Sequence, residues 1–461
     1  MAQFVFETRK EDYFDVVVCG AGSAGVIAAI SAARQGAKVA LIEKNGEVGG
    51  TPVSALVGPF MTCFTPNGKR QIVKGLFDEL VTRLEKKGGA IHPSKTGMVS
   101  SYGCYISHRH NNVAPFSSGL MNIVMAEMLQ ESGVKLFLNN SIVDTIVEPK
   151  SKALKAIVTY DGTGFRIFNA KTFIDCTGNA AVSEKAGVQC LQGNPDDSLE
   201  IQPMTLFFWI YNVDDKKVEE FLDKDPAMKH QPYNAMIEAD RARGNFPVPR
   251  TKIGLYHMVN EGEWKLNTTR MQGYDPSDPD SLNEAYLEGL KQVDFLLDYF
   301  KKCPGLENAR LGQIGNMVGI RESKRIVGEY TLTKEDLFSA KEFEDTIALC
   351  SYPVDMHPSK GNVIGLAYAG AGDVAEVYGI PYRSLLPAGV DNLIVAGRCI
   401  SATREALAAV RIMPTVMAMG EAAGVAASIA AKNSISPKRI SISELRTTLK
   451  TLGACVDIKK E

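Results

Sequence analysis

The residues with the clearest chemical meaning are a glycine-rich turn and an acid that follows it. The run Gly20-Ala21-Gly22-Ser23-Ala24-Gly25 comes directly after a short apolar segment, and Glu43 stands 18 positions beyond Gly25. Gly20 permits a tight turn, Gly22 lets the backbone approach a diphosphate, and Gly25 lets a helix pack closely on a strand. A carboxylate at position 43 accepts hydrogen bonds from ribose hydroxyls and repels a 2′-phosphate. The pattern predicts a dinucleotide site and disfavours NADP.

Two further side chains are candidates for catalysis. Arg321, next to Glu322, could fix a carboxylate through two parallel hydrogen bonds or stabilise developing negative charge. The alternative is a purely structural Arg–Glu pair. His357 could donate or accept a proton. His108 and His110 are two positions apart, which points them away from each other on a helix, and no third ligand is evident, so no metal site is predicted.

Cysteine spacing limits the chemistry further. The nine cysteines are nowhere closer than 14 positions, so the chain has neither CxxC nor CxxxxC. Local support for zinc is lacking and disulfide reductase chemistry is excluded. Cys176 is read as a small buried filler rather than a nucleophile. Scattered thiols indicate a reducing compartment, and a cytoplasmic location is expected.

The elements that must position these residues are a strand, a helix and a second strand. Residues 15–19 form a short β-branched apolar run, an alanine-rich segment follows the glycines to Arg34, and residues 38–42 form the next apolar run. Strands are also expected at 133–138, 141–147, 153–160, 165–168 and 171–176, with a hairpin turn at 161–164. The last of these strands ends in Thr177-Gly178. A parallel sheet with a β-meander is predicted.

The residues after Glu43 distinguish a flavin from a nicotinamide. Lys44, Gly49-Gly50 and Thr51 resemble the continuation of FAD-binding units in the glutathione-reductase-like superfamily, where a double glycine lies against the cofactor. Two later segments resemble places where the chain of this superfamily contacts FAD again. They are the turn Thr177-Gly178 and the apolar strand 391–396, which leads into Gly397-Arg398. Met413-Pro414-Thr415 opens a small-residue helix, because proline suits a first turn. Its N-terminus would face the flavin pyrimidine, or the helix would serve packing alone, or both.

The chain as a whole resembles a bacterial family known as FAD-dependent oxidoreductases, of the fumarate-reductase-like branch. Besides the segments above, the matching runs lie at 56–60, 110–112, 174–178, 202–206, 266–270, 319–325, 380–387 and 411–415. The resemblance implies a bound FAD. One departure is Asn179-Ala180-Ala181, where a more acidic sequence is usual, and this puts the adenine-side contacts in doubt.

The expected fold class is α/β, with a Rossmann-type FAD-binding domain and a mixed α+β substrate domain. The FAD-binding domain comprises 1–60, 120–195 and 390–435, with an insertion at 61–119, a substrate or cap domain at 196–389 and a C-terminal tail at 436–461. A second GxGxxG after a strand is lacking, so a separate NAD domain is not expected. Electrons would therefore enter and leave through a small-molecule substrate and a diffusible acceptor or donor.

The predicted function is hydride transfer between a small polar organic substrate and bound FAD. Dehydrogenation beside a carbonyl, its reverse, and alcohol or sugar oxidation remain open. Two alternatives are a flavin-binding protein without redox turnover and an FAD-dependent RNA-modifying enzyme. The net charge of −2 argues against a nucleic-acid partner. The uncharged stretch 16–33 is glycine-patterned and is read as strand, turn and helix, so no membrane partner is expected.

Overall fold

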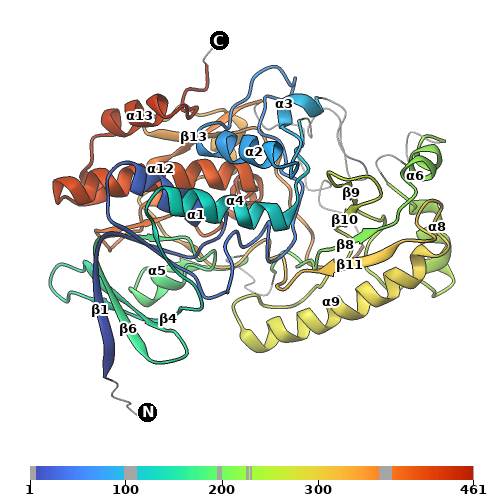
Figure 1. Cartoon of the computed structure of the whole chain (residues 1–461), viewed down its shortest axis with the longest axis horizontal. Helices are drawn as coiled ribbons and strands as arrows, with labels where there is room; N and C mark the ends of the chain where they lie inside the picture. The colour runs from blue at the N-terminus through green and yellow to red at the C-terminus, as the bar shows by residue number, and fades with distance from the viewer. Residues whose placement is uncertain are drawn as a thin grey trace.

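The larger part of the molecule contains a seven-stranded sheet, whose strands β1, β4 and β6 are labelled at the lower left of Figure 1. The structure is a computed structural model and describes residues 7–97, 112–194, 200–224, 228, 231–362 and 376–459. The strand order is β3-β2-β1-β6-β5-β4, with β15 also paired to β6. The strands are β1 Thr8–Cys19, β2 Val39–Ile42, β3 Lys135–Phe137, β4 Ser141–Val147, β5 Leu154–Tyr160, β6 Phe165–Asp175 and β15 Leu393–Val395.

The pairing confirms the α/β fold class, a parallel sheet joined to a β-meander. β1 pairs in parallel with β2 and β6, while β4 and β5 pair antiparallel, as do β5 and β6. β1 and β6 are longer than expected: β6 is one continuous strand, not two. Its first half pairs with the exposed N-terminal half of β1, a polar segment in which apolar periodicity gives no signal.

Helices α1 (Ser23–Arg34) and α12 (Met413–Asn433) pack against each other beside this sheet (Figure 1). Their small residues allow an unusually close approach: a Cβ added at Gly424 would lie 2.3 Å from the carbonyl oxygen of Ala28. Among the described residues, α12 is the one helix long and apolar enough to cross a membrane, but 94% of its apolar window is buried inside the protein. It is therefore a core helix in this fold.

A second body of the molecule carries its own sheet and core. Its four strands run in the order β11-β8-β10-β9 beside the long helix α9 (Figure 1). Its buried apolar residues lie between Met204 and Val318 and form a cluster separate from the first. The elements are β8 Phe208–Tyr211, α6 Asp215–Leu222, α8 Asn234–Ala242, β9 Leu255–His257, β10 Trp264–Leu266, α9 Pro279–Phe300 and β11 Arg310–Ile314.

The expected cap domain of 196–389 is too long. Ile326, Leu332 and Leu337 belong to the larger core, and so do the strands β13 (Thr346–Cys350) and β14 (Tyr378–Pro381). The chain therefore returns to the larger body soon after residue 320, about seventy positions before the expected boundary. Apolar strands look alike in either body, so composition alone misplaced the border.

The described residues of the segments 61–119 and 436–461 also contribute to the core of the larger body. Leu80 and Leu84 of α2 (Leu76–Lys86) and Leu445 and Leu449 of α13 (Ile442–Thr451) are fully buried in it. The remaining elements are α3 Pro93–Thr96, α4 Ser118–Glu131, α5 Ala181–Lys185, β7 Cys190–Leu191, β12 Arg325–Ile326, α10 Lys334–Phe338, η2 Tyr382–Leu385, α11 Arg404–Val410 and η3 Pro437–Arg439.

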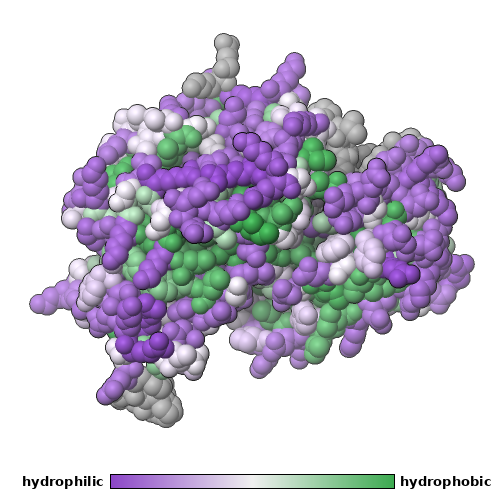
Figure 2. Space-filling model, in the orientation of Figure 1, coloured by the Kyte–Doolittle hydropathy of each residue, from purple (hydrophilic) through white to green (hydrophobic). Residues whose placement is uncertain are grey.

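The surface mixes polar and apolar side chains. Figure 2 shows polar side chains over much of this face, with apolar patches over the middle of the larger body and over part of α9. Exposed large apolar residues such as Tyr13, Ile123 and Leu287 lie on different elements. Scattered apolar residues of this kind are ordinary on folded proteins.

Candidate active site

The turn between β1 and α1 has the packing that the glycine pattern predicts. Gly20 has φ +96°, and a Cβ there would lie 2.6 Å from the carbonyl oxygen of Cys176. A Cβ at Gly25 would lie 1.8 Å from the carbonyl oxygen of Gly20. A Cβ at Gly22 would meet nothing within 4 Å. Gly20 and Gly25 thus close the turn, while Gly22 leaves space beside its backbone.

The N-terminus of α1 is prepared for an anion. Gly22 is the N-cap residue and supplies no side-chain cap, so the first amides of the helix keep donor capacity. The Ser23 hydroxyl is buried and has no hydrogen-bond partner among the described residues. Free amides, the positive end of the helix dipole and an unpartnered hydroxyl together fit a diphosphate.

Glu43 directly follows β2 and faces the same turn. One carboxylate oxygen accepts a hydrogen bond from the Ala21 amide (2.7 Å) and the other from the Asn45 amide (2.9 Å). Each oxygen keeps further acceptor capacity, and the residue lines the cavity described below. Glu43 can therefore hold the turn in place and accept ribose hydroxyls at the same time.

The double glycine folds back onto the turn. The Gly49 amide donates to the Ala21 carbonyl (2.7 Å), and a Cβ at Gly50 would lie 3.0 Å from the Gly22 Cα. Both glycines have positive φ, 106° and 56°. This contact needs the absence of side chains, which explains the pair in physical terms.

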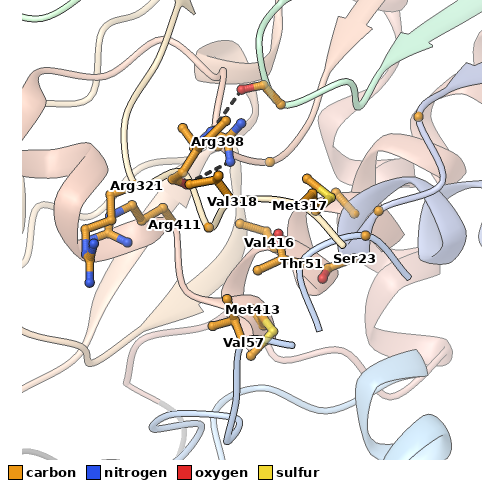
Figure 3. Close-up of a pocket in the computed structure, with 18 of the residues that line it drawn as sticks. Ser23, Thr51, Val57, Met317, Val318, Arg321, Arg398, Arg411, Met413 and Val416 are labelled. Carbon is orange, nitrogen blue, oxygen red and sulfur yellow. Dashed lines mark hydrogen bonds between the residues drawn. The ribbon is translucent and has the colours of Figure 1, made fainter. Parts of the chain in front are cut away.

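Arg398, which lies just after β15, forms hydrogen bonds with two other segments that resemble the family, 174–178 and 319–325 (Figure 3). Its guanidinium donates to the carbonyls of Gly178 (3.0 Å) and Ile320 (2.9 Å) and to the side-chain oxygen of Asn179 (2.8 Å). Burial lowers its pKa to about 10. Asn179, the residue that departs from the family sequence, thus orients an arginine of the cavity wall.

The N-terminus of α12 contributes side chains from one face. Met413 and Val416 line the cavity, whereas Pro414 and Thr415 do not. Thr415 is fully buried, and its hydroxyl donates to the sulfur of Cys350 (3.3 Å). The Thr415 side chain therefore packs between α12 and β13 and does not line the cavity, and its contact with the cofactor stays a prediction.

These segments enclose one cavity of about 510 Å³. It lies between the two bodies, with Ser23 and Thr51 at one end and Arg321 and Arg411 at the other, as Figure 3 shows. The predicted residues that line it are Gly20, Gly22, Ser23, Ala24, Glu43, Lys44, Gly50, Thr51, Thr177, Gly178, Arg321, His357, Gly397, Arg398 and Met413. Gly25, Gly49, Pro414 and Thr415 lie behind the wall.

Arg321 is buried, and among the described residues no carboxylate lies within ion-pair distance of it, although Asp355 attracts it at longer range. Its guanidinium donates to the Pro203 carbonyl (2.7 Å), the Thr205 hydroxyl (2.7 Å) and the Asn267 side-chain oxygen (3.3 Å). Burial and neighbouring arginines lower its pKa to about 9, so it remains charged at pH 7. The guanidinium is held at the cavity wall by neutral acceptors alone.

Glu322 does not pair with Arg321, so the structural pair considered for these neighbours is wrong. Glu322 is fully buried and accepts from Arg404 Nε (2.7 Å) and Nη2 (3.1 Å), while Arg325 lies 3.7 Å away. The side chains of Arg321 and Glu322 have different partners and point in different directions, so their two charges are separated.

His357 and Asp355 form a second pair at the cavity. The ring Nε2 lies 3.2 Å from a carboxylate oxygen of Asp355, and Nδ1 has no partner among the described residues. Burial lowers the pKa of His357 to about 3, so the ring is neutral at pH 7. The Asp355 pKa lies well below its usual range, because His357 and Arg411 outweigh the effect of burial. A neutral ring that donates through Nε2 keeps a basic lone pair on Nδ1.

Several cavity residues had no predicted role. Arg250, Lys252, Asn267, Asp355 and Arg411 line the wall. Asn267 and Arg411 belong to the runs 266–270 and 411–415, which resemble the family, and this resemblance is a signal from which their role could have been predicted. Arg250 and Lys252 follow an ordinary proline-containing loop and give no local signal. His108 and His110 lie outside the described residues, and within the described part of the chain no metal-binding cluster occurs.

The fold and this site define a flavoprotein of the dinucleotide-binding α/β type. The chain matches the family model described as FAD dependent oxidoreductase over residues 15–449 and belongs to that family. The cradle at Gly22, the free Ser23 hydroxyl and the acid at Glu43 fit FAD.

Individual relatives are distant. The chain is 25% identical over 263 residues to dihydrolipoyl dehydrogenase of Trypanosoma brucei brucei, which covers 55% of this chain and 52% of the relative. It is 30% identical over 118 residues to mitochondrial dihydrolipoyl dehydrogenase of Dictyostelium discoideum, 26% of this chain and 21% of the relative. The chain thus matches about half or less of these curated relatives.

The fold also resembles solved structures. A geranylgeranyl bacteriochlorophyll reductase-like protein from Thermoplasma acidophilum superposes with a TM-score of 0.50 at 14% identity, covering 96% of this chain and 84% of that one. This likeness bears on the fold and leaves the substrate open.

Proposed function

We propose that this enzyme moves a hydride between bound FAD and a small polar organic substrate that occupies the Arg321 end of the cavity. The observation that carries the proposal is the placement of Arg321 and His357 in the cavity that also contains the dinucleotide cradle. Bound FAD supplies the two-electron redox chemistry. The substrate and the carriers that exchange electrons with it are small molecules.

Arg321 binds and orients the substrate in this proposal. Its guanidinium is fixed by three neutral acceptors, so little motion is lost when it contacts an anionic or carbonyl oxygen. A buried cation whose hydrogen bonds go to neutral acceptors interacts strongly with negative charge that develops nearby.

His357 offers an unprotonated ring nitrogen to the cavity, but its pKa of about 3 makes it a weak base in the unliganded site, so in this proposal it accepts a proton only after bound substrate has raised that pKa. Asp355 holds the Nε2–H, so the neutral ring presents Nδ1 as the base. We therefore propose a dehydrogenation, beside a carbonyl or at an alcohol carbon, in which the proton passes to His357 and the hydride to FAD. Asp355 acts as a positioning residue for the ring.

Anaerobic bleaching of the bound flavin with a substrate panel tests the proposal. We expect at least one small polar compound to bleach the wild type, and Arg321→Lys to slow bleaching by at least tenfold, because lysine cannot reproduce the guanidinium geometry. Arg310→Lys, at an exposed position of β11, is the matched control. Undiminished bleaching by the Arg321 variant contradicts the role of this side chain.

We also infer a reducing, cytoplasmic location, which the free thiols support: the eight described cysteines form no disulfide. Tagging the protein and locating it by cell fractionation checks this inference.

A further inference from the structure

The segment 202–205 contacts both side chains to which the proposed function gives a role. Arg321 Nη1 donates to the Pro203 carbonyl and to the Thr205 hydroxyl, each at 2.7 Å. The backbone amide of His357 donates to the side-chain oxygen of Gln202 at 3.2 Å. Two residues that are far apart in the sequence are thus held by one short stretch of chain.

Hydrogen bonds at both of its ends hold the segment 202–205 in place. The Gln202 amide donates to a carboxylate oxygen of Glu322 (3.1 Å). Thr205 and Gly319 exchange two backbone hydrogen bonds (3.1 and 2.8 Å). The exposed fractions of Gln202, Thr205 and Glu322 are 1%, 1% and 0%. Because these bonds are buried, the segment is a rigid support for the residues that it contacts.

The main chain at His357 receives little support from its own segment. Residues 351–358 contain no helix or strand, and Pro358 favours an extended backbone at the residue before it. Arg270 donates to the Pro358 carbonyl (2.7 Å), and Asp355 holds the His357 ring. Gln202 is the residue that accepts the hydrogen bond of the His357 amide itself.

Stability alone does not explain a glutamine at position 202. Its Nε2 is buried and has no hydrogen-bond partner among the described residues, and a buried amide with one unsatisfied end costs free energy. An apolar side chain of similar length would avoid this cost but would leave the His357 amide without its acceptor. A glutamate would place a second carboxylate beside Glu322. A neutral side chain with an acceptor at this reach therefore fits the contact with His357.

We propose that Gln202 is a positioning residue for the reaction, which fixes the main chain of His357 to the segment that also holds Arg321 and so sets the place of the proton acceptor relative to the substrate-binding cation. Gln202 does not line the cavity, so it acts through His357. The roles of His357 and Arg321 rest on the proposed function, whereas the placement of His357 by Gln202 does not.

Histidine NMR of the FAD-loaded protein tests this placement without a substrate. The protein is prepared with isotope-labelled histidine, and the signal of His357 is the one that His357→Gln removes. We expect Gln202→Met to shift or broaden this signal, because the main chain at His357 then occupies more than one position. Gln202→Asn, whose shorter side chain withdraws the acceptor but stays polar, should have the same effect.

Thr269→Val is the matched control for the loss of a buried acceptor. The Thr269 hydroxyl is fully buried and accepts from the backbone amide of Leu206 (2.8 Å), and it donates to the carbonyl of the same residue. Valine has the same shape and removes both bonds. The His357 signal should stay unchanged in this variant, because the lost bonds lie within the core of the second body.

The rate of anaerobic bleaching tests the consequence for the reaction. Glycerol, lactate and malate are the probes, and the one that bleaches the wild type fastest is used. Gln202→Met should lower the limiting rate by at least tenfold and change the half-saturating concentration by less than threefold, because Arg321 keeps its acceptors at Pro203 and Thr205. Gln202→Glu, whose protonated form beside Glu322 keeps the acceptor, should restore at least a third of the wild-type rate.

Three results would overturn the inference. They are an unchanged His357 signal in both loss variants, an equal disturbance of that signal in Thr269→Val, and a loss of affinity without a loss of limiting rate. Retained FAD content shows that each variant is folded. A wild type that none of the three probes bleaches would count against hydride transfer with compounds of this class, while the NMR comparison still decides whether Gln202 places His357.

Discussion

Replacing Gly22 by alanine should separate cofactor binding from folding. Gly22 has an extended backbone (φ −76°, ψ −169°) that any residue adopts, and its added Cβ meets no atom within 4 Å. Alanine also restricts the unfolded chain more than glycine does. We therefore expect the apoprotein of Gly22→Ala to be as stable as the wild type, or more stable by about 0.4–1 kcal/mol.

The same methyl group should damage FAD binding. Gly22 lines the cavity next to the first amides of α1, so its Cβ would occupy the space in which a diphosphate approaches them. Hydrogen bonds from amides to a charged acceptor contribute about 1.5–3 kcal/mol each. Loss of two such bonds costs about 3–6 kcal/mol, which corresponds to an affinity roughly 10² to 10⁴ times weaker.

Gly25→Ala provides the contrast. Its Cβ would lie 1.8 Å from the Gly20 carbonyl oxygen, so the helix and strand must move apart. Overpacking of this kind costs about 1–3 kcal/mol or more of folding stability. The assays are flavin content after purification, the FAD Kd by fluorescence, and urea unfolding of both apoproteins. A Gly22→Ala protein that binds FAD with wild-type affinity, or that unfolds as readily as Gly25→Ala, would refute the reasoning.

Three further predictions concern stability. Burial raises the pKa of Glu421 from 4.5 to about 7, so the stability of the wild type falls as the pH rises through this window. The stability of Glu421→Gln relative to the wild type, measured by urea unfolding, should therefore grow by about 3 kcal/mol from pH 4 to pH 8. A difference that does not change with pH would contradict this prediction. Burial lowers the pKa of Lys265 from 10.5 to about 7, so the buried ammonium destabilises the folded protein fully below pH 7 and no longer does so towards pH 10.5. The free energy of unfolding of Lys265→Met should therefore exceed that of the wild type by up to about 5 kcal/mol at pH 6 and by little at pH 10. An equal difference at both pH values would argue against this prediction. Gly424→Ala should lower the melting temperature, because its Cβ would lie 2.3 Å from the Ala28 carbonyl oxygen. Gly119→Ala on α4 is the control and should leave the melting temperature unchanged, because its Cβ would meet no atom within 4 Å. Equal melting temperatures for the two variants would contradict the packing of α12 on α1.

Family membership bears on the alternatives to a redox enzyme. The match over residues 15–449 is to FAD dependent oxidoreductases, which supports redox function rather than flavin binding without turnover. The whole chain has a net charge of −2, and RNA binding would call for an extended basic surface, so the absence of an RNA partner stays a prediction.

The sequence alone determined the dinucleotide cradle, because its parts are close along the chain. Gly20, Gly22, Gly25 and Glu43 belong to one strand–helix–strand unit, whose geometry depends on local backbone freedom and on one parallel pairing. The later turns at Thr177 and Gly397, which follow β6 and β15, were also predictable, because each apolar run stops just before a glycine.

The tertiary structure decided which side chains share the far end of the cavity. Arg250 and Arg321 meet at Asn267, and Glu322 pairs with Arg404 although these residues are 82 positions apart. No periodicity encodes such contacts, because they depend on how the two bodies pack. The border near residue 320 is of the same kind: a buried apolar strand has the same composition in either core, and only its packing shows to which core it belongs.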